Sequence, residues 1–234
     1  MFTVNVSLAS TAEYSSKAAE SIKDLNPNAA DLLITSVITS MVTDLGVVAP
    51  TASGLLTYYD GDNNSTHSVD GYFVAPKKFD GNDHEEHRIS MTYGGHVETC
   101  KGANTFAVPG IYKILNLIFE RYASLPLEKL LEFPIKTAKE GFKLTQPTKD
   151  YFIHSLEPMF MWHEQSKIAL TNVYEDLENG IVKLDKLADT LGHMSDEGFN
   201  DFYIGDISKS IVETLKIEGG HATQDDFNGY DLIE

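Results

Sequence analysis

The sequence predicts an α+β protein, in which a small antiparallel sheet of about five strands is covered by N-terminal helices and followed by a helical C-terminal part. Several short stretches before residue 102 alternate apolar with polar residues, as half-buried strands do. After Pro109, apolar residues recur at helical spacing in segment after segment. Apolar residues make up 42% of the 234, which is enough for a sizeable core.

The N-terminal part is expected to hold one strand and two helices. Residues 2–8, FTVNVSL, alternate as a strand. The helix predicted over 10–27 starts with Ser10 and Glu13 in capping-box spacing and ends at Pro27. The next, over 28–46, has Asn28 as its N-cap and Gly46 just past its end. Its broad apolar face indicates that it packs on the sheet.

Two hairpins are predicted next, and then helices. The first joins 54–60 to 66–76 through a polar turn, and the second joins 87–93 to 96–101 through Gly94 and Gly95. Helices are expected over 109–124, 126–133, 147–157, 158–180, 181–192 and 206–220. The predicted regions are therefore a sheet region over 1–106, a helical region over 107–218 that is either separate or continuous with the first, and a tail over 219–234.

Residues 82–100, NDHEEHRISMTYGGHVETC, concentrate histidines and acids around the single cysteine. In a tight hairpin His87 and His96 share a face but stand about 20 Å apart at roughly 3.3 Å per residue, too far to bind one ion. Asp83, His84 and His87 with Cys100 are a poor match to the converging ligands of a zinc site. We predict a structural hairpin with no metal and no cofactor, and keep these four residues as the site of an alternative small hydrolase.

Charge is unevenly distributed along the chain. The net charge is −17, from −8 over residues 1–100, +4 over 101–149 and −13 over 150–234. The basic stretch carries a lysine ridge, which a phosphate-binding face, a solvated helix or an interface would each produce. Its residues are Arg121, Lys129, Lys136, Lys139 and Lys143. The overall negative charge makes nucleic acid an unlikely partner.

The tail over 219–234, GGHATQDDFNGYDLIE, interleaves acids with aromatic and aliphatic residues after two glycines. This pattern suits a linear motif that docks in a basic, apolar groove. The predicted partner-binding residues are Asp225, Asp226, Phe227, Tyr230, Asp231, Leu232 and Ile233. The last residues also resemble the acidic tips of single-stranded-DNA-binding proteins, which leaves open a nucleic-acid-binding protein with a regulatory tail.

The common nucleophile, nucleotide and zinc signatures are missing from the sequence. By elimination we predict a non-catalytic interaction or assembly protein, either a structural subunit or an inhibitor that presents an acidic, DNA-like surface. Its partner would be a basic protein or its own copies in a homo-oligomer. Sixteen lysines against two arginines favour a phage or viral origin. No signal sequence or membrane span is apparent, so a cytoplasmic location is expected.

Overall fold

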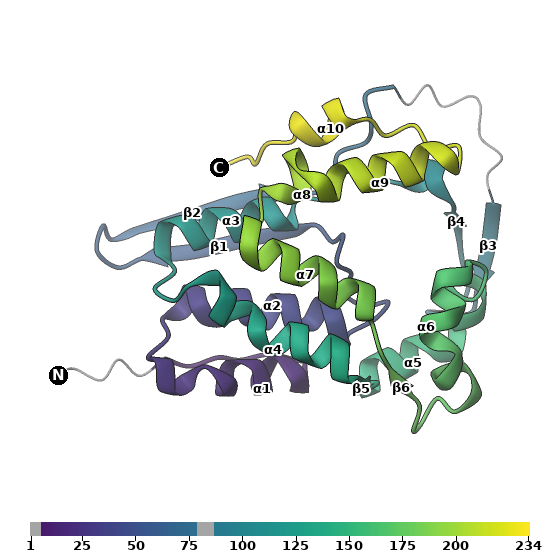
Figure 1. Cartoon of the computed structure of the whole chain (residues 1–234), viewed down its shortest axis with the longest axis horizontal. Coiled ribbons are helices and arrows are strands. Elements are labelled where there is room, and N and C mark those ends of the chain that lie inside the picture. Colours follow the sequence, from purple (N-terminus) through teal and green to yellow (C-terminus); the bar gives the residue numbers. More distant parts are fainter. Residues whose placement is uncertain (1–5, 79–86) are drawn as a thin grey trace. The chain divides into compact units, whose positions relative to one another are not determined.

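The computed structural model describes residues 6–78 and 87–234, with only the backbone of His87. The chain divides into two compact units. Unit 1 comprises Met1–Pro50, Arg88–Thr99 and Phe119–Asp196, and unit 2 comprises Thr51–His87, Cys100–Ile118 and Glu197–Glu234. Each unit is assembled from three separate stretches, whereas the predicted regions are continuous. Figure 1 labels the elements.

Unit 1 is mainly helical. Its N-terminal helices are α1 (Glu13–Ser21), the 3-10 turn η1 (Lys23–Leu25) and α2 (Ala29–Thr43). It also holds the end of α3 (Ile111–Tyr122), and then α4 (Leu127–Glu140), α5 (Gln146–Ser155), the π turn η3 (Leu156–Phe160), α6 (Glu164–Glu175) and α7 (Asp185–Glu197). α2 packs against both α1 and α4, and its Ile34 and Ile38 are fully buried.

Short strands complete unit 1. It contains most of β3 (His87–Met91) and of β4 (Val97–Lys101), together with β5 (Phe142–Lys143) and β6 (Ile181–Val182). β5 and β6 pair antiparallel, with Phe142 opposite Val182. Two-residue strands are too short to show a sequence period, so neither was predicted.

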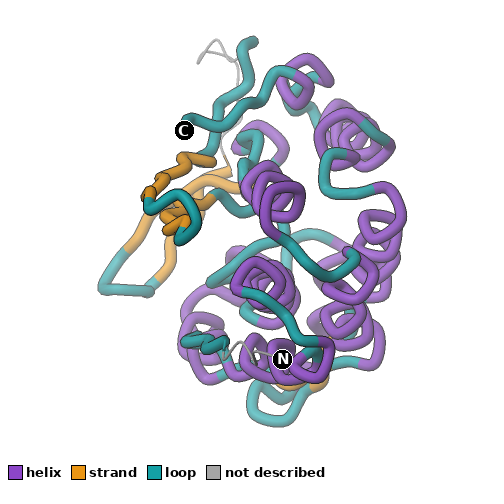
Figure 2. Tube along the Cα trace, turned by 90° about the vertical axis from the view of Figure 1, so that its left-hand side faces the viewer, coloured by secondary structure: helices purple, strands orange, loops and turns teal. Residues whose placement is uncertain are grey.

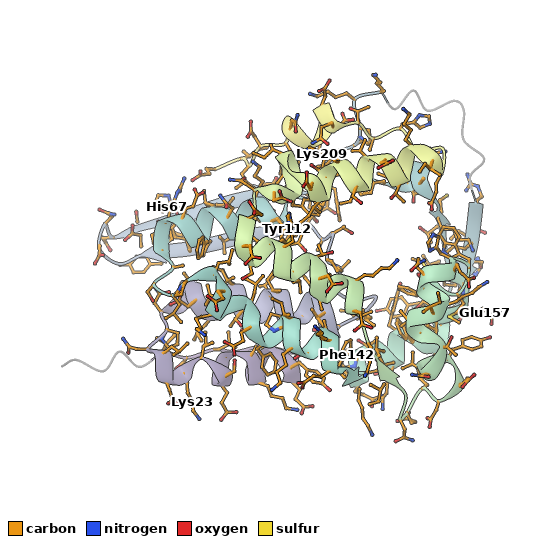
Figure 3. All side chains as sticks on the ribbon, viewed as in Figure 1. Lys23, His67, Tyr112, Phe142, Glu157 and Lys209 are labelled. Atoms are coloured by element: carbon orange, nitrogen blue, oxygen red, sulfur yellow. The ribbon has the colours of Figure 1, made fainter. Side chains whose placement is uncertain are left out.

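Unit 2 consists of a hairpin, the first part of α3 and the C-terminal helices. The hairpin is β1 (Gly54–Asp60) with β2 (Ser65–Gly71), paired residue by residue from Gly54↔Gly71 to Asp60↔Ser65. The others are the 3-10 turn η2 (Ala103–Thr105), α8 (Asp201–Ile204), α9 (Asp206–Ile217) and α10 (Gln224–Asn228). Tyr112 of α3, labelled in Figure 3, is buried and its ring lies 4.6 Å from that of Phe202.

The predicted mixture of helices and antiparallel strands is confirmed, but the single sheet of about five strands is wrong. The described strands form separate two-stranded pairs, β1–β2, β3–β4 and β5–β6, shown in orange in Figure 2. Residues 6–8 of the first predicted strand have no regular structure, and the rest of it lies outside the described residues. Alternation identifies a strand and its hairpin partner, but it does not specify which further edges join.

Asp44, at the C-terminal end of α2, is a buried acid with an unfavourable charge. Burial raises the pKa of its carboxyl, although hydrogen bonds from Ser40, Thr145 and Thr43 act in the opposite direction. Because the folded-state pKa is raised, the Asp44 carboxyl contributes its full stability below the unfolded-state pKa. That contribution is lost as pH rises through the folded-state pKa. At neutral pH the charged carboxylate therefore lowers stability.

We expect Asp44→Asn to raise the melting temperature of unit 1 at pH 7 and to lose that advantage in acid, where Asp44 is protonated. The exposed Asp24 provides a charge-matched control, because Asp24→Asn also removes one negative charge. Thermal unfolding of both variants between about pH 3 and pH 7, a range in which carboxyl groups titrate, would test this. A gain that is equal in both variants would point to net charge rather than burial.

Candidate functional site: the open face of the hairpin

The most distinctive surface of unit 2 lies on the β1–β2 hairpin and on the extended chain that follows it. We call it the open face and define it by Leu55, Tyr59, Asp70, Tyr72, Val74 and Ile233. Leu55 is opposite Asp70 in the ladder, and Ile233 pairs with Asp70 from the other side, so their side chains share a face. Leu55 and Ile233 are 75% and 70% exposed. Large apolar side chains therefore border an acid on this surface.

Backbone hydrogen bonds hold the segment after β2 in place. The amide of Asp70 donates to Ile233 O at 2.8 Å, and the amide of Ile233 donates to Asp70 O at 3.1 Å. Val74 exchanges two similar bonds with Val108. The Asp70 carboxylate also accepts from the Tyr72 amide at 2.8 Å. The exposed rings of Tyr72 and Phe73, 5.6 Å apart, are thus carried on a fixed backbone.

Tyr230 of the C-terminal segment contacts the backbone of the open face and packs in the core below it. The Tyr230 hydroxyl donates to Tyr72 O at 2.7 Å, and the Tyr230 ring stacks on Tyr203 at 5.6 Å. Burial, together with the nearby Asp70 carboxylate, raises the pKa of Tyr230 to about 12, so the phenol remains a donor at neutral pH. Tyr203 in turn donates to Pro109 O. Tyr230 therefore anchors the tail in the unit 2 core.

The predicted partner-binding residues of the tail are divided between core and surface. Phe227 and Tyr230 are 0% and 3% exposed, so in this structure their rings are not available to a partner. Asp226 is buried as well, whereas Asp225, Asp231 and Ile233 are exposed and Leu232 is half-buried. A sequence signal for this docking existed, because Thr223 and Asp226 have capping-box spacing at the start of α10.

Asp226 fixes this segment electrostatically. Its Oδ1 accepts from the Lys77 amide at 2.9 Å, and its Oδ2 accepts from the amide and hydroxyl of Thr223. Burial opposes ionisation, but these hydrogen bonds prevail and hold the pKa of Asp226 below its ordinary value. Because its folded-state pKa is lowered, the Asp226 carboxylate contributes stability above the unfolded-state pKa. This stability is lost as pH falls through the folded-state pKa.

Asp226→Asn should therefore destabilise unit 2 by about 1–2 kcal/mol at pH 7, with the difference from wild type shrinking in acid. The neighbouring Asp225→Asn is the matched control, because Asp225 is exposed in the same helical turn. Urea unfolding of both variants at neutral and acidic pH measures the effect. Equal losses in the two variants would contradict a specific role for the Asp226 carboxylate.

The histidine-rich stretch is only partly described. Asp83 and His84 lie outside the described residues, only the backbone of His87 is described, and Cys100 is a half-buried free cysteine on β4. Within the described residues no three His, Cys, Asp or Glu side chains are placed to hold a metal ion. His96 lies 3.7 Å from Glu98 and also reaches Ser90. The connection spans residues 92–96 and is longer than the two-residue turn predicted.

Unit 1 contains a hydroxyl–imidazole pair that the sequence did not indicate. Thr92 Oγ1 lies 2.6 Å from His154 Nδ1, and the Tyr93 ring packs edge-on against Tyr151 at 5.1 Å. Such a pair is the first requirement of a nucleophile with its base. Among the described residues, however, no side chain bonds the other ring nitrogen of His154, so the orienting group of a catalytic triad is missing there. The pair tethers the β3–β4 turn to α5.

The lysine ridge does not form a continuous cationic surface. Lys129 pairs with Glu132 at 3.3 Å and Lys136 with Glu140 at 4.0 Å, and Lys139 shares the groove between α4 and α7 with acids. Arg121 lies at the end of α3 and Lys143 on β5. Acids that alternate with the lysines reduce the positive potential that a phosphate would require. None of the helices in the described part is long and apolar enough to cross a bilayer.

Comparison with known proteins identifies relatives along nearly the whole chain. The Gamma-glutamyltranspeptidase family model matches residues 15–233. Scoloptoxin SSD14 of Scolopendra dehaani is 27% identical over 97% of this chain and 38% of its own length. The glutathione hydrolase proenzyme of Escherichia coli is 25% identical over 74% of this chain and 29% of its own. The chain thus spans well under half the length of these relatives.

Solved structures show the same fold. The gamma-glutamyltranspeptidase of Pseudomonas nitroreducens, complexed with L-DON, superposes with a TM-score of 0.78 at 25% identity, covering 97% of this chain and 65% of that one. The Helicobacter pylori gamma-glutamyltranspeptidase gives a TM-score of 0.79 at 20% identity, covering 100% and 66%.

The family, the Escherichia coli relative and the two solved structures are named as enzymes, so the predictions of a non-catalytic assembly or interaction protein, and of a viral one, are wrong. The predictions failed because they rested on the absence of common short motifs, whereas the family match extends over residues 15–233. The match over residues 15–233 shows that the chain belongs to the gamma-glutamyltranspeptidase family.

Proposed function

We propose that this chain forms part of an enzyme that cleaves γ-glutamyl amide bonds, such as the one in glutathione, and passes the γ-glutamyl group to water or to an amine. The family match over residues 15–233 is the observation that carries the proposal. Several relatives named glutathione hydrolase support the substrate class. In the hydrolytic reaction the amide C–N bond breaks, water adds to the acyl carbon, and glutamate and the free amine leave.

Amide cleavage requires an activated nucleophile and donors that stabilise the developing oxyanion. Within the described residues the Thr92–His154 pair is the arrangement nearest to a nucleophile with its base, but it lacks the group that would orient the imidazole. We therefore assign the chain a scaffolding contribution to the site, with unit 2 presenting the open face. Thr92→Val should leave any γ-glutamyl activity unchanged.

The test is glutamate release from glutathione and from a chromogenic γ-glutamyl anilide. The tagged full chain would be isolated gently from its native source, with Escherichia coli glutathione hydrolase assayed in parallel. We expect release to co-purify with the chain and to persist in Thr92→Val. If the preparation releases no glutamate from either substrate while the reference enzyme does, the proposal fails. Loss of release in Thr92→Val would instead place the nucleophile in this chain.

A further inference from the structure

The turn at the tip of the β1–β2 hairpin contains two overlapping acceptor patterns for N-linked glycosylation. Residues 63–66 are Asn-Asn-Ser-Thr, so Asn63 and Asn64 each begin an Asn-x-Ser/Thr pattern without proline at its middle position. Asn63, Asn64 and Thr66 are exposed, and the turn projects away from α8, α9 and α10 (Figure 1). A bulky glycan needs a surface position of this kind. The fold therefore leaves room for a modification at this turn.

Hydrogen bonds distinguish the two asparagines of the turn. Asn63 helps to close the turn, because its Nδ2 donates to Asp60 Oδ2 at 2.8 Å and its backbone amide donates to Asp60 Oδ1 at 3.2 Å. The side-chain oxygen of Asn64 accepts from the Tyr59 hydroxyl at 2.8 Å, whereas its Nδ2 donates to none of the described residues. A sugar on Asn63 would crowd the Asp60 carboxylate. A sugar on Asn64 would leave all of these hydrogen bonds in place.

An exposed aromatic ring lies beside Asn64. Tyr59 is 64% exposed and is opposite Thr66 in the ladder, so the ring and the last residue of the Asn64 pattern share a face of the hairpin. A β-carbon built on Gly61 would lie 3.8 Å from Tyr59 Cε1, which shows that the ring leans over the turn. Asn64 itself has a φ of 50°, a left-handed conformation that asparagine tolerates well. The Tyr59 ring is therefore placed to cover the apolar face of a sugar attached to Asn64.

We infer that Asn64 carries an N-linked glycan and that the first sugar of this glycan packs on the Tyr59 ring. The donor would be an oligosaccharide linked to a lipid pyrophosphate. The bond between sugar C1 and the pyrophosphate oxygen breaks, and the lipid pyrophosphate leaves with the electron pair. C1 then bonds to Asn64 Nδ2, which loses one proton. This modification is independent of the proposed γ-glutamyl activity.

Glycosylation at Asn64 has a consequence for where the chain is made. The transfer takes place in the lumen of the endoplasmic reticulum, so the chain would enter the secretory pathway instead of remaining in the cytoplasm, the location expected from the sequence. The glycan would also act on the fold. A two-stranded hairpin is only marginally stable, and a sugar held against Tyr59 would join the end of β1 to the start of β2. The tip of the hairpin should therefore open less often.

Two neighbouring hydroxyls provide a matched pair of variants for locating the glycan. Thr66→Ala removes only the Asn64 pattern, whereas Ser65→Ala removes only the Asn63 pattern. The tagged full chain and both variants are produced in cells of the native source. Peptide N-glycosidase in oxygen-18 water converts a glycosylated asparagine into labelled aspartate, which mass spectrometry locates. Because Asn5 begins a third pattern, the label is read in the peptide that contains residues 61–66.

We expect the label on Asn64 in the wild-type chain and in Ser65→Ala, and we expect it to be lost in Thr66→Ala. An unlabelled turn in the wild-type chain would overturn the inference. So would a label on Asn63 in place of Asn64, or a label that persists in Thr66→Ala.

A second measurement tests the contact with Tyr59. Hydrogen exchange of the amides at the hairpin tip is compared between chains trimmed to the first sugar and chains with the glycan fully removed. Tyr59→Ala is the test variant, and Tyr72→Ala removes a ring of similar exposure, 61%, beyond the far end of β2. Full removal leaves aspartate at position 64 in every chain, so the change of charge is the same throughout.

The first sugar should slow exchange by about two- to tenfold in the wild-type chain and in Tyr72→Ala, which is the range that a ring-stacking contact gives. It should have no effect in Tyr59→Ala. An equal effect in all three chains, or no effect in the wild-type chain, would overturn the contact between the sugar and Tyr59.

Discussion

Replacing Gly110 with alanine is expected to destabilise unit 2 by about 1–3 kcal/mol or more. Gly110 immediately precedes α3, and its carbonyl accepts from the amides of Lys113 and Ile114. A β-carbon at this position would overlap both the Tyr230 hydroxyl and the carbonyl of Gly71. The backbone of Gly71 cannot yield without shifting β2, so the added methyl group has no free space to occupy.

The same substitution should loosen the open face. Tyr230 would have to move, and its hydrogen bond to Tyr72 O would lengthen or break. Hydrogen exchange of the amides in β2 and α10 should therefore accelerate together with global unfolding of unit 2.

Gly192→Ala is the control for this experiment. Gly192 lies inside α7, and a β-carbon there would have nothing within 4 Å. Alanine in a helix interior is favoured over glycine by about 0.8–1.0 kcal/mol, so this variant should gain stability. If packing decides the outcome, urea unfolding should show changes of opposite sign in the free energy of unfolding of the two variants. A loss below about 0.5 kcal/mol in Gly110→Ala would show that the glycine contact is not tight.

Local signals in the sequence predicted local structure well. Asn28 is the N-cap of α2, as expected, and its side chain accepts from the Asp31 amide in a reciprocal capping box. β1 and most of the helices fall where the periodicity put them. These features depend on residues within a few positions of one another, and the sequence shows those residues directly.

Features that depend on distant contacts could not be predicted. Asp226 bonds the Lys77 amide, 149 positions away in the chain, and this contact is what docks the acidic tail. The buried rings of Phe227 and Tyr230 were interpreted as a linear motif because their partners lie on other elements. The open face also depends on tertiary contacts, since Leu55 and Ile233 become neighbours only through their pairing with Asp70.

The other large effect is expected at Asp31 in unit 1. Its carboxylate is fully buried and accepts four hydrogen bonds. Oδ1 accepts from the amides of Ser124 and Leu125 at 3.0 and 3.1 Å. Oδ2 accepts from the amide of Asn28 and the hydroxyl of Ser124. One side chain therefore joins the start of α2 to the loop between α3 and α4, a link across more than 90 positions of the chain.

Asp31→Ala would leave three amides and a hydroxyl without an acceptor in a site with little access to water. Each unsatisfied donor costs about 1–3 kcal/mol before relaxation, so we expect a total loss above about 3 kcal/mol. Asp31→Asn keeps the shape of the side chain and one acceptor oxygen, but its amide NH2 would face hydrogen-bond donors. The loss of stability in this variant should therefore be intermediate. Ser124→Ala removes only the hydroxyl bond and should cost about 1 kcal/mol.

Asp24→Ala provides the baseline, because Asp24 is exposed on η1 and its removal should change stability by no more than about 0.5 kcal/mol. Urea unfolding of the four variants, with hydrogen exchange measured in α2 and α4, should rank the losses of stability. From largest to smallest we expect Asp31→Ala, Asp31→Asn, Ser124→Ala and Asp24→Ala. If Asp31→Ala and Ser124→Ala cost the same, the amides of Asn28, Ser124 and Leu125 must find other acceptors. The carboxylate would then cap α2 without joining it to the α3–α4 loop.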